Sequence, residues 1–304
     1  MIANLYLPTD SIQYNGIDSD EEVKTKLNSF IRDLVYIEQY KSENIIHVGK
    51  DIYEINITKD QNIFSVASML AHEESNLIYS ILGNTSDMCE NPLTDLIKAC
   101  QEDTDDECTT IIAFNTIDIP ETIHYIIYNK TSWFTFRREM LGKHHKNDPD
   151  YFVEECKKYF TELYFHENNK SVVGEYLEKS AIKFINYLSA LNDSFNEYKK
   201  SNPGVNTNDM LANFSRLHKM DDQASLQGNA SKKKLLTFDF EAIKLENKQK
   251  YSKSILCEPH LKICYPDDPN DPKKENYCAR IYFHFGDAEV HMGKILIGSI
   301  GPHV

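Results

Sequence analysis

Apolar and polar positions near the start of the chain change from strand spacing to helical spacing. The apolar run over 2–7 is typical of a strand, whereas Val23, Leu27 and Leu34 belong to a stripe of apolar residues three or four positions apart. Ser19 and Glu22 have capping-box spacing, which predicts a helix beginning at residue 20. The predicted elements of this region are strands over 2–7, 45–48 and 52–58 and helices over 20–40 and 63–82.

The middle of the chain combines an acidic stretch with further strand-like and helix-like segments. Residues 84–108 have the composition of a loop, and the acidic run over 102–107 lacks the glycine turn and distal glutamate of a calcium loop. Asp148 followed by Pro149 is typical of a helix N-terminus. The predicted elements here are strands over 109–114, 122–128 and 133–136 and helices over 149–163 and 171–195.

A change of composition at 199–234 divides the chain. This segment is rich in Asn, Ser, Gly, Asp, Gln and Lys and contains one short helical pattern, over 210–217, so we interpret it as a linker or mobile connection. The predicted organisation is an acidic α+β domain over 1–198, the linker over 199–234 and a β-rich module over 235–304.

Strict alternation predicts an antiparallel meander in the C-terminal module. In a strand over 255–265, Glu258, His260 and Lys262 share one face, and a second strand over 277–285 places Arg280 and Tyr282 on its polar face. A third strand over 294–300 completes the meander. The opposite, apolar faces hold Ile255, Cys257, Leu261, Ile263 and Tyr265 in the first strand and Tyr277, Ala279, Ile281, Phe283 and Phe285 in the second. The predicted fold class is α+β: a mixed helix-and-strand N-terminal region with a C-terminal antiparallel β module.

Charge is distributed unevenly along the chain. The net charge is −14, but residues 232–304 carry 12 Lys+Arg and 10 Asp+Glu, so the rest of the chain has a balance of −16. A whole-surface attraction to nucleic acid or an anionic membrane is therefore excluded, and any polyanion must bind locally. The acidic N-terminal region is expected to bind a protein partner. No apolar run is long enough to span a membrane, and seven scattered cysteines suit reduced thiols, so we expect a cytoplasmic protein.

The polar face of the C-terminal strands supplies the candidate chemistry. Arg and Lys stabilise phosphoryl oxygens, His and Glu exchange protons near neutral pH, and Tyr can stack on a base or supply a proton. Such a set suits recognition and cleavage of a phosphodiester without a metal, and no cofactor is expected. The candidate catalytic residues are Glu258, His260, Lys262, Arg280, Tyr282 and His303.

The last seventy residues resemble the RelE/ParE-like toxin family. The resemblance is carried by His260-Leu-Lys262, Arg280-Ile-Tyr-Phe283 and Gly298-Ser-Ile-Gly-Pro-His303. It implies a small sheet that cuts RNA with basic and aromatic side chains. The leading hypothesis is thus a bacterial-type toxin or phage-defence effector that binds RNA or another phosphate-bearing ligand. Under this hypothesis the protein could also cleave RNA by metal-independent acid–base chemistry.

Three other interpretations compete for the same residues. An antiparallel sheet can simply expose one polar face to solvent. Cys257, His260, Cys264 and Cys278 offer four zinc-compatible ligands, although they can meet only if a bulge at Pro259 reverses the alternation. A noncatalytic binding or scaffold subunit of a multiprotein defence assembly also fits, since the chain has no P-loop, dinucleotide fingerprint, Gly-X-Ser-X-Gly elbow or His-Glu-X-X-His motif.

Overall fold

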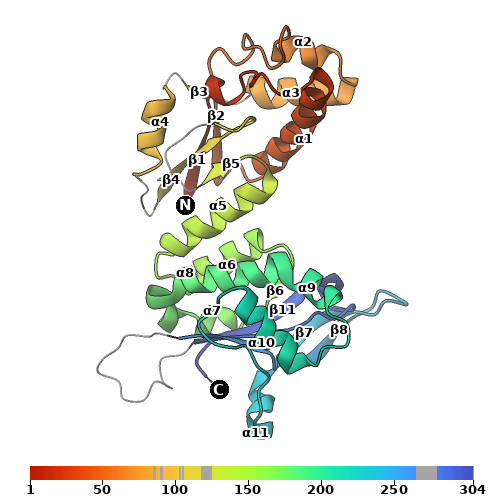
Figure 1. Cartoon of the computed structure of the whole chain (residues 1–304). Coiled ribbons are helices and arrows are strands. Elements are labelled where there is room, and N and C mark those ends of the chain that lie inside the picture. Colours follow the sequence, from red (N-terminus) through yellow and green to blue (C-terminus); the bar gives the residue numbers. More distant parts are fainter. Residues whose placement is uncertain are drawn as a thin grey trace. The chain divides into compact units, whose positions relative to one another are not determined.

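The computed structural model divides the chain into two compact units, Met1–Met140 and Leu141–Val304 (Figure 1). The structure describes residues 1–84, 87–89, 92–102, 104, 106–117, 125–264 and 279–303. Helices accompany both parallel and antiparallel sheets, so the predicted mixed α+β class is confirmed. None of the helices in these residues is long and apolar enough to cross a membrane.

A five-stranded parallel sheet, in the order β3-β2-β1-β4-β5, forms the centre of the first unit. The middle strand β1 pairs with β2 on one side, where Leu5 lies opposite Ile46, and with β4 on the other, where Leu5 lies opposite Thr110. The strands are β1 (Ile2–Leu7), β2 (Asn44–Gly49), β3 (Asp87–Cys89), β4 (Glu107–Ile112) and β5 (Ile126–Ile127). The helices are η1 (Thr9–Ser11), α1 (Asp20–Glu38), α2 (Ile63–Ser68), α3 (His72–Asn84), α4 (Leu93–Ala99) and α5 (Lys130–Lys143).

The N-terminus of α1 has the predicted capping box. The Ser19 side chain accepts from the Glu22 backbone N–H, and the Glu22 carboxylate accepts from the Ser19 backbone N–H at 2.8 Å. These bonds satisfy amide donors that have no partner within the helix. The stripe of Val23, Leu27 and Leu34 is buried. The sequence therefore located both the start and the inner face of this helix correctly.

Three predictions in the first unit are wrong. Trp133–Phe136 is not a strand but part of α5, because the buried positions Trp133, Phe136 and Met140 recur three and four residues apart. Residues 52–58 form turns, with local bonds such as Ile52 N–H to the Gly49 carbonyl in place of ladder pairing. The supposed loop over 84–108 contains β3, α4 and the first residues of β4.

Two sheets build the second unit. The larger has the order β6-β11-β10-β9, in which β9, β10 and β11 form the predicted antiparallel meander and β6 adds in parallel to β11. Its strands are β6 (Leu163–Phe165), β9 (His260–Ile263), β10 (Ala279–His284) and β11 (Ile295–Gly301), and the smaller sheet is the hairpin of β7 (Thr237–Ile243) and β8 (Lys250–Leu256). The helices are α6 (Pro149–Tyr159), α7 (Asn169–Val172), α8 (Gly174–Ala190), the π-helical turn η2 (Leu191–Phe195), α9 (Asn196–Ser201), α10 (Thr207–Leu217), α11 (Ala230–Lys233), η3 (Lys234–Leu236) and η4 (His291–Gly293).

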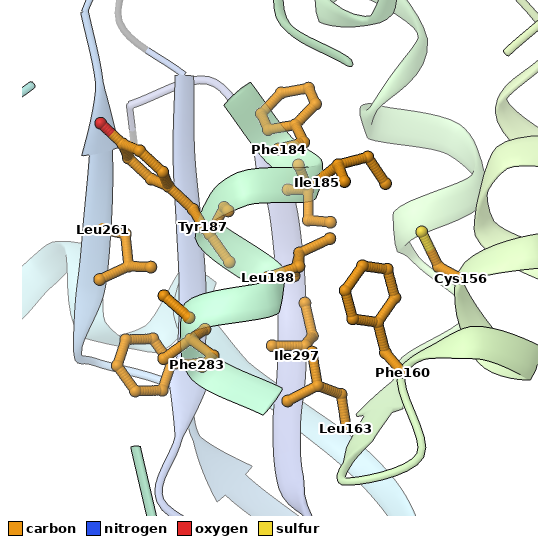
Figure 2. Close-up of a cluster of buried hydrophobic side chains, with 14 of the residues drawn as sticks. Cys156, Phe160, Leu163, Phe184, Ile185, Tyr187, Leu188, Leu261, Phe283 and Ile297 are labelled. Carbon is orange, nitrogen blue, oxygen red and sulfur yellow. The ribbon is translucent and has the colours of Figure 1, made fainter. Parts of the chain in front are cut away.

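One face of the larger sheet packs against the helices. Figure 2 shows Phe184 and Leu188 of α8 beside Leu261, Phe283 and Ile297 of three successive strands. Because Leu261 and Phe283 alternate with polar residues in β9 and β10, filling this face with apolar side chains directs the polar set of these two strands to the opposite face.

The predicted linker over 199–234 is part of this core and does not separate two domains. Met210, Leu211 and Phe214 of α10 are buried in the same cluster as Phe195, whose ring lies 5.0 Å from that of Phe214. The division by contacts falls instead at 140/141, within α5. Polar residues dominate the composition of 199–234 because only one stripe of the short helix α10 faces inward.

Candidate anion-binding site

The pairing of β9 with β10 brings four of the six candidate residues together. Arg280 lies opposite Lys262, and Tyr282 lies opposite His260. Since directly opposed side chains on antiparallel strands have Cβ atoms about 5 Å apart, each pair is in contact range. On the far side of β10, Ser299 of β11 lies opposite Tyr282. The polar residues thus form two adjacent rows on one face of the sheet.

His260 lies beneath the surface of this cluster. Its ring is 4% exposed and its centroid is 5.0 Å from that of Tyr282. Nε2 is 3.4 Å from the Ser225 hydroxyl, and Nδ1 is 3.3 Å from the Glu258 carbonyl oxygen. Burial, followed by the positive charges of nearby groups, lowers the pKa of His260 to about 4. The imidazole is therefore neutral at pH 7.

Positive charge is concentrated around His260. The groups whose charges lower its pKa are Arg280, Lys262 and His303. Lys262 and Arg280 are partly exposed and His303 is exposed. The Arg280 Nε is buried and makes no hydrogen bond among the described residues. Glu258 is partly exposed as well, whereas His260 and Tyr282 are buried.

A carboxylate from the same chain lies against this positive charge. Asp222 Oδ2 is 3.2 Å from Lys262 Nζ. Burial alone would raise the pKa of Asp222, but hydrogen bonds from the Gln223 amide and Lys262, and the charges of Lys262 and Arg280, lower it. Asp222 therefore neutralises part of this positive charge.

The segment 221–227 covers the edge strand β9. Ser225 and His260 exchange backbone hydrogen bonds of 3.2 and 3.0 Å. Asp221 Oδ2 accepts from the Cys264 amide at 3.1 Å and from Lys183 Nζ at 2.7 Å. This cover was missed because it lies in the predicted linker. In the sequence, apolar and polar residues alternate only over the four positions Ala224, Ser225, Leu226 and Gln227, which gives a weak strand signal.

Glu258 and Tyr282 do not have the positions that catalysis would require. The Glu258 carboxylate pairs with Lys233 of α11 at 2.7 Å, and no contact of that carboxylate with the other candidate residues occurs in the described chain. Tyr282 is fully buried, in a cluster with Leu296 and residues of the β7–β8 hairpin. The hairpin covers this part of the polar face, which the sequence had left open. Tyr282 therefore cannot contact a ligand at the surface in this conformation, and the Glu258 carboxylate is engaged by Lys233.

The predicted strand that carries three of the potential zinc ligands is interrupted. The single strand predicted over 255–265 is two strands, β8 and β9, interrupted at residues 257–259. Cys257 consequently packs with the β7–β8 hairpin, whereas Leu261, predicted to share its face, packs against the helices. Cys278 lies outside the described residues. Among the described residues, no three or more His, Cys, Asp or Glu side chains are grouped to hold a metal ion.

Comparison of the chain with protein-family models, with curated proteins and with solved structures finds no match. The resemblance to RelE/ParE-like toxins therefore stays a prediction. The geometry of the site has to carry the functional argument.

Proposed function

We propose that the second unit binds a phosphate-bearing ligand, with RNA as the first candidate, through Lys262, Arg280 and His303. The observation that carries this proposal is the direct opposition of Lys262 and Arg280 across β9 and β10. Two like charges placed opposite each other destabilise a sheet unless an anion lies between them. Asp222 provides one negative charge at this position, and a phosphate group would provide more.

The arginine also has the right donors for a phosphate. Guanidinium groups bind phosphate oxygens through two parallel hydrogen bonds, and Arg280 is partly exposed. Its Nε makes no hydrogen bond among the described residues but is buried, so this atom would have to be uncovered before it could donate to a ligand. The charge division supports a local polyanion site as well. Residues 1–140 carry 10 Lys+Arg and 24 Asp+Glu, whereas residues 141–304 carry 23 of each. The second unit thus has no net charge to repel RNA, and the acidic first unit suits a protein partner with a basic surface.

The biological role proposed on this basis is that of a toxin or defence effector that acts on RNA. Cleavage by acid–base chemistry would need His260 to meet the ligand, and its 4% exposure means that segment 221–227 would first have to move. Binding of a phosphate beside His260 would favour the imidazolium and raise its pKa toward neutrality. Metal-independent RNA cleavage that is lost in His260→Gln would support this step, and intact RNA after long incubation would remove it.

The binding proposal is tested with the full chain and a fluorescent single-stranded RNA. We expect Lys262→Gln and Arg280→Gln each to weaken binding about tenfold and to lower the salt dependence by about one released counterion. Lys250→Gln is the matched control, because it removes one positive charge from an exposed site on β8. Equal affinity of all four proteins at low salt would refute the proposal and favour a noncatalytic scaffold.

A further inference from the structure

A cavity of about 750 Å³ lies at the edge of the parallel sheet in the first unit. It is formed by the N-terminal half of α1, the segment before it and the residues that follow β4 and β5. Its lining residues are Asp18, Glu21, Glu22, Thr25, Lys26, Ser29, Phe30, Asp33, Phe114, Thr116, Tyr128 and Asn129. Cavities of this size hold small molecules.

The position of the cavity follows from the order of the strands. The chain builds the sheet outward from β1 through β2 to β3, then returns to add β4 and β5 on the other side of β1. The direction in which strands are added reverses between β1 and β4, so the loops that follow these two strands lead away from each other. In open parallel sheets, ligands bind near this point, at the carboxyl ends of the strands. Phe114 and Thr116 follow β4 directly, so the cavity lies on the β4 side of the reversal.

The wall nearest the reversal is held rigidly. Buried Asn115, which follows β4, bonds to the segment that follows β1. Its backbone N–H donates to the Ser11 carbonyl at 2.9 Å, and its side chain donates to the Gln13 carbonyl at 2.7 Å. Lys26 Nζ donates to Asn115 Oδ1 at 2.7 Å. These bonds connect the segment after β4 to the segment after β1 and to α1, which favours a site that changes little on binding.

Aromatic rings form the floor. Phe30 and Phe114 meet edge to face, with centroids 5.4 Å apart, and they are 5% and 3% exposed. Tyr128 adds a third ring at the rim. Lys26 Nζ lies 4.7 Å from the Phe114 centroid, so the ring that a flat ligand can reach is that of Tyr128, which is 37% exposed.

The charge of the lining disfavours phosphate. Its described residues include four carboxylates and one lysine, Lys26, which is already bound to Asn115 and lies 3.4 Å from Asp18. A concave site with this excess of negative charge repels anions and attracts neutral or positively charged molecules. This preference is opposite to that of the Lys262 and Arg280 pair.

Several polar groups of the lining remain available to a ligand. One oxygen of Asp33 accepts from the Lys130 amide at 3.1 Å, while its second oxygen has no partner among the described residues. The hydroxyls of Ser29 and Thr116 also make no hydrogen bond within that part of the chain. The carboxylate can only accept, so it selects a ligand that donates.

We propose that this cavity binds a flat, nitrogen-containing ring compound that donates hydrogen bonds and carries no phosphate, the chemistry of a nucleoside. The ring packs against Tyr128, and an amino or hydroxyl group donates to Asp33. Binding here is independent of the anion site in the second unit.

The test is calorimetric titration of the full chain, carrying Lys262→Gln and Arg280→Gln so that the proposed anion site of the second unit does not contribute, with adenosine, cytidine and uridine and, in parallel, with their 5′-monophosphates. At least one nucleoside is expected to bind with a Kd below about 1 mM, and its monophosphate to bind about tenfold more weakly because of the negative lining. Absence of nucleoside binding up to about 10 mM overturns the proposal. Tighter binding of the monophosphates overturns it equally, because the charge argument would then be wrong.

Two variants place the ligand in the cavity. Ser29→Trp fills the space from an exposed position on α1, and Asp33→Asn keeps the shape but replaces the accepting oxygen. Both are expected to weaken nucleoside binding at least about tenfold with an unchanged circular dichroism spectrum. Glu38→Trp, at the exposed end of the same helix, is the control and should bind as the wild type does. Undiminished binding by both cavity variants would contradict the assignment.

Discussion

Protonation of His260 should make the second unit unstable at mildly acidic pH. Its folded-state pKa of about 4 lies below the usual histidine value of 6.5, because the ring is buried next to positive charges. As the pH falls, the unfolded chain therefore takes up the proton first. The stability contributed by a neutral His260 is fully present above pH 6.5 and is lost as the pH falls toward 4.

The size of this effect follows from the two pKa values. When the pH falls from 7 to 5, the unfolded chain binds more protons at this histidine than the folded chain does. The free energy of unfolding therefore falls by about 2 kcal/mol. His260→Gln removes the titration and keeps a side chain that can hydrogen-bond to Ser225. We expect urea unfolding, followed by circular dichroism, to lose about 2 kcal/mol more in the wild type than in His260→Gln over this range.

The titration can also be followed directly by NMR of the histidine ring protons, with His260→Gln identifying the resonance. His72→Gln, at an exposed position of the first unit, controls for the loss of a histidine elsewhere. A His260 pKa near 6.5, together with equal acid sensitivity of the wild type and His260→Gln, would refute the reasoning. It would mean that the ring is accessible to water and that the proposed cluster of cations is absent.

Three further predictions address the fold. Phe214→Ala should lower the free energy of unfolding of the second unit by about 3–5 kcal/mol in urea, because Phe214 is fully buried. The same substitution in a mobile linker would leave the free energy of unfolding almost unchanged. Burial raises the pKa of the Cys257 thiol to about 12, so a thiol reagent should label partly exposed Cys264 in the native protein and leave Cys257 unmodified until urea is added. Ser19→Ala should cost the first unit about 1 kcal/mol, measured by the fluorescence of the single tryptophan, Trp133; no loss would show that the capping box is not formed.

The sequence predicted the features that depend only on residues close together in the chain, such as helix starts and the faces of strands. The Ser19 and Glu22 spacing located a helix start, and the alternation around His260 and Arg280 predicted two antiparallel strands with the right side chains facing each other. Both patterns work because the period of an element fixes which side chains share a face.

Features that depend on distant segments were not accessible in this way. Trp133 and Phe136 favour a strand by composition, yet they lie in a helix that packs against the first unit's core. Pro259 interrupts a strand whose alternation otherwise continues, so the face of Cys257 could not be read from period alone. The burial of Tyr282 depends on a hairpin, and the contact of Asp222 depends on a segment that has little periodicity of its own.

The most direct test of the anion site is a double-mutant cycle on RNA binding by the full chain. If Asp222 pairs with the same cations that bind the RNA, it competes with the RNA for them. Asp222→Asn should then tighten RNA binding severalfold in the wild-type background, since the RNA no longer displaces a carboxylate. The same change should have almost no effect when Lys262 and Arg280 are both replaced by Gln. An equal gain in both backgrounds would show that Asp222 acts only through general repulsion, and it would contradict the assignment of Lys262 and Arg280 as the ligand-binding pair.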